Sequence, residues 1–111
     1  MRVTGLWKGL FLLAGVAACG CFPAESRHIG AVDPINNVPA MEEAARTHDT
    51  KAIPALVKQL ESDDPAIRFY AIEALHRITG KTFDFHYYQD ADERRPAVKR
   101  WQNWLARQSQ K

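Results

Sequence analysis

The 111-residue sequence has few cysteines and few glycines, and both shortages narrow the chemistry open to it. Cys19 and Cys21 are its only cysteines, and they lack the further partners that a structural zinc site or a disulfide framework needs. The six glycines form no phosphate-binding loop, and the four histidines include no pair at four-residue spacing for a catalytic zinc. No nucleophile-elbow motif is present either. We therefore expect no enzyme activity, no cofactor and no metal site.

The net charge of the chain is also small. The formal net charge is +2, and removing Arg2 and Lys8 from the 15 basic residues leaves 13, which equals the 13 acidic ones. A balanced chain has no general attraction for nucleic acid, so we expect no nucleic-acid partner. The C-terminus is locally basic, which favours either contact with an anionic surface or, more commonly, a solvated helix face. Its basic residues are Arg94, Arg95, Lys99, Arg100, Arg107 and Lys111.

The first 18 residues contain an apolar run that is short for a membrane span. No charged residue occurs from Gly9 to Ala24, and the centre of this stretch is the run from Leu10 to Ala18. A spanning helix needs about 20 apolar residues, whereas the core of a signal peptide needs about 7–15. The length favours an export signal, with a membrane helix or an ordinary cleaved signal as the alternatives.

The run ends in Val16-Ala17-Ala18-Cys19, which resembles the lipobox of bacterial lipoproteins. The resemblance implies cleavage between Ala18 and Cys19, with residues 1–18 as signal peptide and lipid attached to the Cys19 sulfur. Several acyl chains, such as palmitate, then hold a protein stably on a bilayer. Cys21 is the alternative attachment site, but the preceding Ala18-Cys19-Gly20 lacks a larger aliphatic residue. We expect a lipid-anchored protein of the bacterial cell envelope, on the inner or the outer membrane.

Residues 19–37 are predicted to form a flexible tether, because Pro23, Gly30 and Pro34 interrupt a segment without helical periodicity. Residues 38–111 are predicted to form an all-α domain, because apolar residues recur at spacings of three and four. We expect about four helices, over residues 38–48, 50–62, 65–79 and 93–108, capped by Asn37, Asp49, Asp64 and Asp92. Pro65 suits the first position of the third helix, and Gly80 suits its left-handed C-cap.

One stretch of the predicted helices carries a family pattern. Its residues are Ala52-Ile53-Pro54-Ala55-Leu56-Val57, Leu60, Asp63-Asp64-Pro65-Ala66-Ile67-Arg68, Ala71-Ile72 and Ala74-Leu75. Over residues 49–80 this stretch resembles a HEAT-like repeat of the PBS-lyase type. The resemblance implies an antiparallel helix pair of an α-α superhelix, a role in protein binding, and an acidic partner for Arg68. A stable solenoid ordinarily needs about three repeats, whereas one is found here.

The flanking segments are therefore expected to cover the open sides of this repeat. Phe83, Phe85 and Tyr87 alternate with polar residues, as in an extended strip that lays an aromatic edge over the helices. The last helix gathers Ala97, Val98, Trp101, Trp104 and Leu105 on one arc, whose tryptophans are expected to close the open end. The expected core face of the third helix comprises Ile67, Ala71, Ala74, Leu75 and Ile78, widened by Phe69 and Ile72. The residues given structural roles are Asp64, Pro65, Arg68, Gly80, Trp101 and Trp104.

Tyr70, Glu73 and Arg77 share the opposite side of the third helix at 3.6 residues per turn, and we interpret them as a partner-binding face. The alternative is a solvated face with an ion pair between Glu73 and Arg77. The sequence thus predicts a protein–protein interaction module that binds an unidentified envelope protein. One alternative is a structural or pilot subunit of an envelope assembly that docks through its tryptophans. A weaker one is a lyase-like enzyme or a metal-binding protein using Asp84 and His86.

Overall fold

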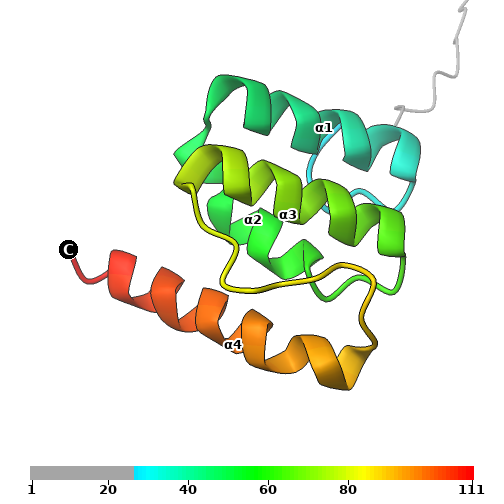
Figure 1. The fold of residues 1–111 in the computed structure, drawn as a ribbon. Coiled ribbons are helices and arrows are strands. Elements are labelled where there is room, and N and C mark those ends of the chain that lie inside the picture. The colour runs from blue at the N-terminus through cyan, green and yellow to red at the C-terminus, as the bar shows by residue number, and fades with distance from the viewer. Residues whose placement is uncertain (1–26) are drawn as a thin grey trace, which may run out of the picture.

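A computed structural model of the chain describes residues 27–111, and helices account for 67% of them. No strand occurs between residues 27 and 111. The prediction of a small all-α fold with about four helices is therefore confirmed. The elements are α1 (Pro34–Thr47), the 3-10 turn η2 (Thr50–Ala52), α2 (Ile53–Gln59), α3 (Pro65–Thr79) and α4 (Ala91–Gln108) (Figure 1).

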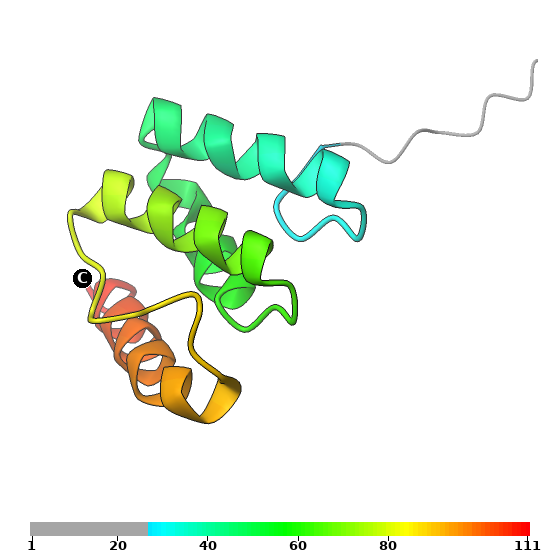
Figure 2. The same ribbon diagram turned by 45° about the vertical axis from the view of Figure 1, so that its right-hand side comes forward.

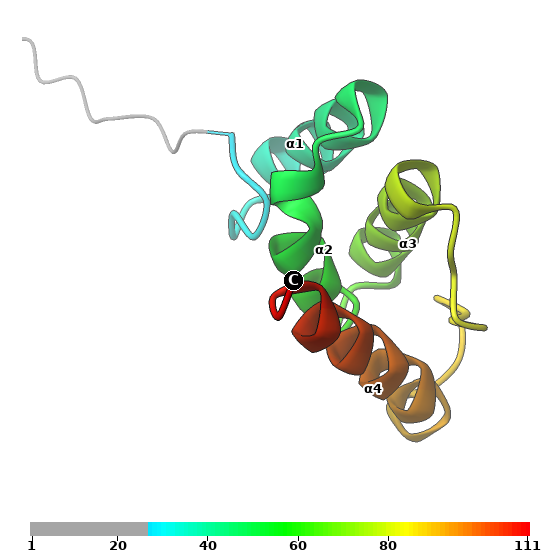
Figure 3. The same cartoon turned by 90° about the vertical axis from the view of Figure 1, so that its left-hand side faces the viewer.

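The helices are stacked in a zigzag, with α1 at one end of the stack and α4 at the other (Figure 3). Helix α3 packs against both α1 and α2, and α2 also contacts α4. The α3–α4 linker, residues 81–90, runs back along α3 before α4 begins (Figures 1 and 2). This segment therefore lies between α3 and α4.

Helix α1 begins at Pro34, four residues before the predicted start, because Asp33 and not Asn37 is its N-cap. The Asp33 carboxylate accepts a hydrogen bond from the Ile35 N–H at 3.0 Å, and Pro34 fills the first helical position. The Asn37 side chain is 3% exposed and instead binds the Gly30 N–H and the Gln59 side chain. The predicted tether over residues 19–37 is thus wrong for residues 34–37, while residues 19–26 lie outside the described part.

The helix predicted over residues 50–62 is present as two pieces, η2 and α2, because Pro54 stands in the first turn of α2. Its predicted end is wrong, because α2 ends at Gln59 and the chain then turns. Asp49 caps the first piece as expected, through the Lys51 N–H at 3.0 Å. Helix α3 has the predicted bounds. The Asp64 carboxylate accepts from the Ala66 N–H at 2.9 Å, and Gly80 ends the helix at a φ of 76°.

Helix α4 begins at Ala91, and its N-cap is Asp90 instead of the predicted Asp92. The Asp90 carboxylate accepts from the Glu93 N–H at 2.9 Å, and the Glu93 carboxylate accepts from the Asp90 N–H at 3.2 Å. This reciprocal capping box satisfies two backbone donors at once. Asp92 lies inside the first turn, where it pairs with Arg95.

The core lies where the inner faces of all four helices meet the linker. Its fully buried large side chains are Met41, Leu56, Leu60, Leu75 and Trp101. The predicted core face of α3 is buried at Ile67, Ala71, Ile72, Ala74 and Leu75 and partly buried at Ile78. Phe69 is an exception, because 38% of it is exposed. Among the described residues, every helix is too short or too polar to cross a membrane.

Candidate functional site: an aromatic surface beside helix α3

Tyr70, Glu73 and Arg77 lie together on α3, as their spacing predicts, and they face the edge of α1. A cavity of about 150 Å³ separates the two helices there. Tyr70 is half-buried, whereas Glu73 and Arg77 are exposed. The wall supplied by α1 could not be seen in the sequence, and it consists of Met41, Glu42 and Ala45.

The two charged residues of this face are not engaged with each other. Among the described residues, no ion pair within 4.0 Å joins Glu73 to Arg77, although the sequence allowed one. The alternative of a solvated helix face included an ion pair between these two residues, and that ion pair is not formed. The cavity walls carry two carboxylates, those of Glu42 and Glu73, against the single guanidinium of Arg77.

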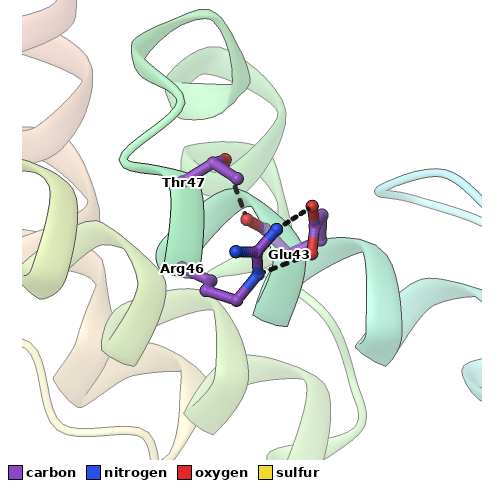
Figure 4. A network of polar contacts seen from close by, with 3 residues as sticks. All are labelled: Glu43, Arg46 and Thr47. Carbon is purple, nitrogen blue, oxygen red and sulfur yellow. Dashed lines mark hydrogen bonds and ion pairs between the residues drawn. The ribbon is translucent and has the colours of Figure 1, made fainter.

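A polar network on α1 lies outside this cavity (Figure 4). The Arg46 guanidinium donates to both carboxylate oxygens of Glu43, at 3.0 and 2.6 Å, and the Thr47 hydroxyl donates to the Glu43 carbonyl oxygen at 2.9 Å. The hydrogen bonds from Arg46 lower the pKa of Glu43, and Glu43 in turn raises the pKa of Arg46. Because the pair is solvated, it adds little to stability and offers a neutral control position.

Next to the cavity, five aromatic rings form a continuous row that we name the aromatic row: Tyr70, Phe69, Tyr87, Tyr88 and His86. Successive ring centroids are 5.4, 5.1, 5.4 and 5.4 Å apart, and the first three contacts are edge-to-face. Such spacing is the preferred geometry of aromatic pairs. Tyr88 is the most open member, at 68% exposed. The row thus presents apolar ring surface and tyrosine hydroxyls to solvent.

The backbone beneath the aromatic row is held by Arg68. Its guanidinium donates to the carbonyl oxygen of Tyr87 at 2.9 Å and to that of Ser62 at 2.7 Å. One buried side chain therefore ties the linker to the turn between α2 and α3. Because these bonds fix the linker, the rings of Tyr87 and Tyr88 are presented from a constrained backbone.

The expectation of an acidic partner for Arg68 is wrong, since both of its hydrogen bonds in the described residues go to carbonyl oxygens. Burial lowers the pKa of Arg68, and the nearby Arg94 lowers it further, while Asp64 and Asp63 act in the opposite direction. The guanidinium nevertheless stays charged, as arginine does in proteins. One acceptor of Arg68 therefore comes from the linker, at Tyr87, and the other from the α2–α3 turn, at Ser62.

The two tryptophans of α4 differ in their surroundings. Trp101 is fully buried, and its ring meets Phe83 edge-to-face at 4.8 Å. Trp104 is half-buried, and its ring centroid lies 5.7 Å from that of Trp101. Trp104 also lines a cavity of about 770 Å³ at the meeting point of three helix ends, together with Ile53, Ile78 and Leu105.

The extended aromatic strip predicted for the linker is only partly correct. Phe83 and Asp84 adopt left-handed backbone conformations, with φ of 52° and 61°, so the alternation breaks there. Phe85 is buried and Phe83 half-buried, as expected for a covering strip, but Tyr87 turns outward into the aromatic row. The Phe83 ring packs against Trp101 and Trp104 of α4, a contact that a pattern of alternation does not show.

The residues considered for metal binding form a pair without a third ligand. His86 Nε2 lies 3.1 Å from a carboxylate oxygen of Asp84. Between residues 27 and 111, no group of three or more metal-ligating side chains is assembled. The predicted cleavage and lipid-attachment positions, Ala18 and Cys19, together with Cys21, lie outside the described residues.

The sequence located part of this surface and missed the rest. The sequence pattern places Tyr70 on the partner-binding face, but it predicts Phe69 in the core and Tyr87 in a covering strip. Tyr88 and His86 received no role in the surface, because only the path of the linker brings them beside α3. Comparisons with protein-family models, with curated proteins and with solved structures found no match to this chain.

Proposed function

We propose that this protein is a lipid-anchored component of the bacterial cell envelope that binds another envelope protein through the aromatic row. The observation that carries the binding role is the continuous exposure of Phe69, Tyr87 and Tyr88 on a backbone fixed by Arg68. Tyrosine and other aromatic residues are enriched at the centres of protein interfaces. The lipobox-like sequence that ends in Cys19 supports the anchor.

The hydrogen bonds from Arg68 that hold the linker favour a higher affinity for the proposed partner. Binding costs free energy when side chains and loops must be ordered, so a surface that is already fixed loses less on association. The edge-to-face contacts from Phe69 to Tyr87 and from Tyr87 to Tyr88 hold the rings in position in the same way. The cavity beside Tyr70 adds a depression into which one partner side chain could insert.

A structural role in an envelope assembly is a second candidate, and it is favoured by the cavity beside Trp104. That cavity is lined mainly by apolar groups, and none of its lining residues is charged. Because Trp104 is half-buried at its wall, an apolar helix of a neighbouring subunit could dock there. In this role Trp104, and not Tyr88, would be the principal contact.

A photo-crosslinking amino acid placed at position 88 in intact bacteria tests the first candidate. We expect a discrete adduct with one envelope protein, and the same crosslinker at position 43, on the solvated side of α1, serves as the control. The double substitution Phe69→Ser and Tyr87→Ser should remove the adduct, because 38% of Phe69 and 36% of Tyr87 are exposed on the aromatic row. Circular dichroism of the purified variant checks that the domain remains folded. Equal adducts from positions 43 and 88, or an adduct that survives the double substitution, would contradict binding through the aromatic row.

A further inference from the structure

A second cavity, distinct from the aromatic row, has walls of opposite charge. It measures about 420 Å³ and lies between the α2–α3 turn and the first half of α4. Glu61 and Asp63 line it from the turn, whereas Arg94, Arg95 and Lys99 line it from α4. Its volume is within the range of about 300–1,000 Å³ that is typical of small-molecule sites. We name it the dipolar cleft.

The charges on the two walls do not neutralise each other. Within the described residues, no ion pair of 4.0 Å or less crosses the dipolar cleft. Arg95 is engaged on its own helix, with Asp92 at 2.6 Å. The carboxylates of Glu61 and Asp63 and the ammonium group of Lys99 are thus available to a ligand.

Arg94 is the best-defined member of the basic wall. Only 8% of it is exposed, and one of its N–H groups donates to the Gln89 carbonyl oxygen at 2.5 Å. A guanidinium has five N–H donors, and in the part of the chain that the structure describes no other donor of Arg94 has an acceptor. These remaining donors can therefore bind a phosphate or carboxylate oxygen of a ligand in the cleft.

We infer that the dipolar cleft binds a compact zwitterion whose phosphate or carboxylate contacts Arg94 and Lys99 and whose ammonium group contacts Glu61 and Asp63. A simple anion would meet the two carboxylates, and a simple amine would meet the buried guanidinium, so neither satisfies both walls. A charge-assisted hydrogen bond from arginine to phosphate or carboxylate is among the stronger polar contacts in proteins. This site depends neither on the aromatic row nor on Cys19.

Phosphoethanolamine is a suitable probe because it combines both groups in one small molecule. The full-length protein is titrated with phosphoethanolamine, with inorganic phosphate and with ethanolamine, and binding is followed by calorimetry and by amide NMR shifts. We expect phosphoethanolamine to bind at least about tenfold more tightly than either of the other two, with shifts concentrated at the α2–α3 turn and the start of α4.

Two conservative substitutions at exposed positions separate the two walls. Glu61→Gln should remove most of the preference for phosphoethanolamine over phosphate, and Lys99→Gln should weaken the binding of both. Glu43→Gln and Lys51→Gln, which change the same charges at residues that do not line the cleft, are the matched controls and should leave binding unchanged. No binding, equal binding of phosphate and phosphoethanolamine, or indifference to both cleft substitutions would overturn the inference.

The same zwitterion occurs free and as a lipid headgroup, and vesicles distinguish the sources. The Cys19→Ser protein, which lacks the proposed acylation site, is mixed with vesicles of phosphatidylethanolamine in phosphatidylglycerol or of phosphatidylglycerol alone. Retention that requires phosphatidylethanolamine and is lost in Glu61→Gln supports headgroup binding. Binding of soluble phosphoethanolamine without such retention supports a free ligand, and retention on both vesicles that is unaffected by Glu61→Gln contradicts recognition of a zwitterion.

Discussion

The indole Nε1 of Trp101 donates a hydrogen bond to the carbonyl oxygen of Thr82 at 3.0 Å, although the two residues are 19 positions apart. Trp101 therefore does two things at once. Its ring fills the core, and its only polar group fixes the start of the linker. Because the linker continues to Tyr87 and Tyr88, the core and the aromatic row are joined through one short segment.

Truncation of Trp101 is expected to be strongly destabilising. Trp101→Ala should lower the free energy of unfolding by about 3–5 kcal/mol, as for other buried aromatic residues that leave a cavity. Trp104→Ala is the matched comparison and should cost less than half as much, because Trp104 is only half-buried. Chemical denaturation measures both values. A loss below about 1 kcal/mol for Trp101→Ala would contradict its assignment to the core.

The capping of α4 gives a prediction with a neighbouring control. Asp90→Ala should destabilise the domain by about 0.5–2 kcal/mol, because the Glu93 N–H loses its acceptor and the capping box is broken. Asp92→Ala removes only an exposed pair with Arg95 and should have a near-zero effect. A larger loss for Asp92→Ala in thermal or chemical unfolding would contradict the role of Asp90 as the N-cap of α4.

Arg68 should be sensitive to the shape of its side chain as well as to its charge. Arg68→Lys keeps the charge but cannot reach the Ser62 and Tyr87 carbonyl oxygens with one fork, so we expect a loss of roughly 1.5–3 kcal/mol, the value of a charged hydrogen bond. Hydrogen exchange across residues 83–89 should accelerate in this variant. Unchanged exchange there would show that other contacts hold the linker.

Helix boundaries could be predicted from the sequence where they are set by residues within a few positions of the helix end. Asp64 and Pro65 start α3 and Gly80 ends it, because an acceptor side chain, a fixed φ and a left-handed residue act within a few positions. The same Asp-Pro signal at Asp33 and Pro34 starts α1, but Asn37 next to Val38 suggested a later start. Asn37 is instead buried against Gln59 of α2, a tertiary contact that the local sequence does not show.

Features that depend on the path of the linker could not be predicted. Phe69 lies on the border of the apolar face of α3, and only the arrival of Tyr87 beside it makes an exposed row instead of a core contact. The family resemblance implies an acidic partner for Arg68, whereas the folded linker brings the Tyr87 carbonyl group to it. Likewise, the charges of the dipolar cleft meet only when α4 packs beside the α2–α3 turn.

Metabolic labelling with a palmitate analogue, combined with membrane fractionation, tests most directly whether the protein is anchored through Cys19. We expect the wild-type protein and the Cys21→Ser variant to carry the label and to sediment with membranes, and the Cys19→Ser variant to lose the label. An unlabelled wild-type protein in the soluble fraction, or label that persists in Cys19→Ser and disappears in Cys21→Ser, would contradict an anchor at Cys19.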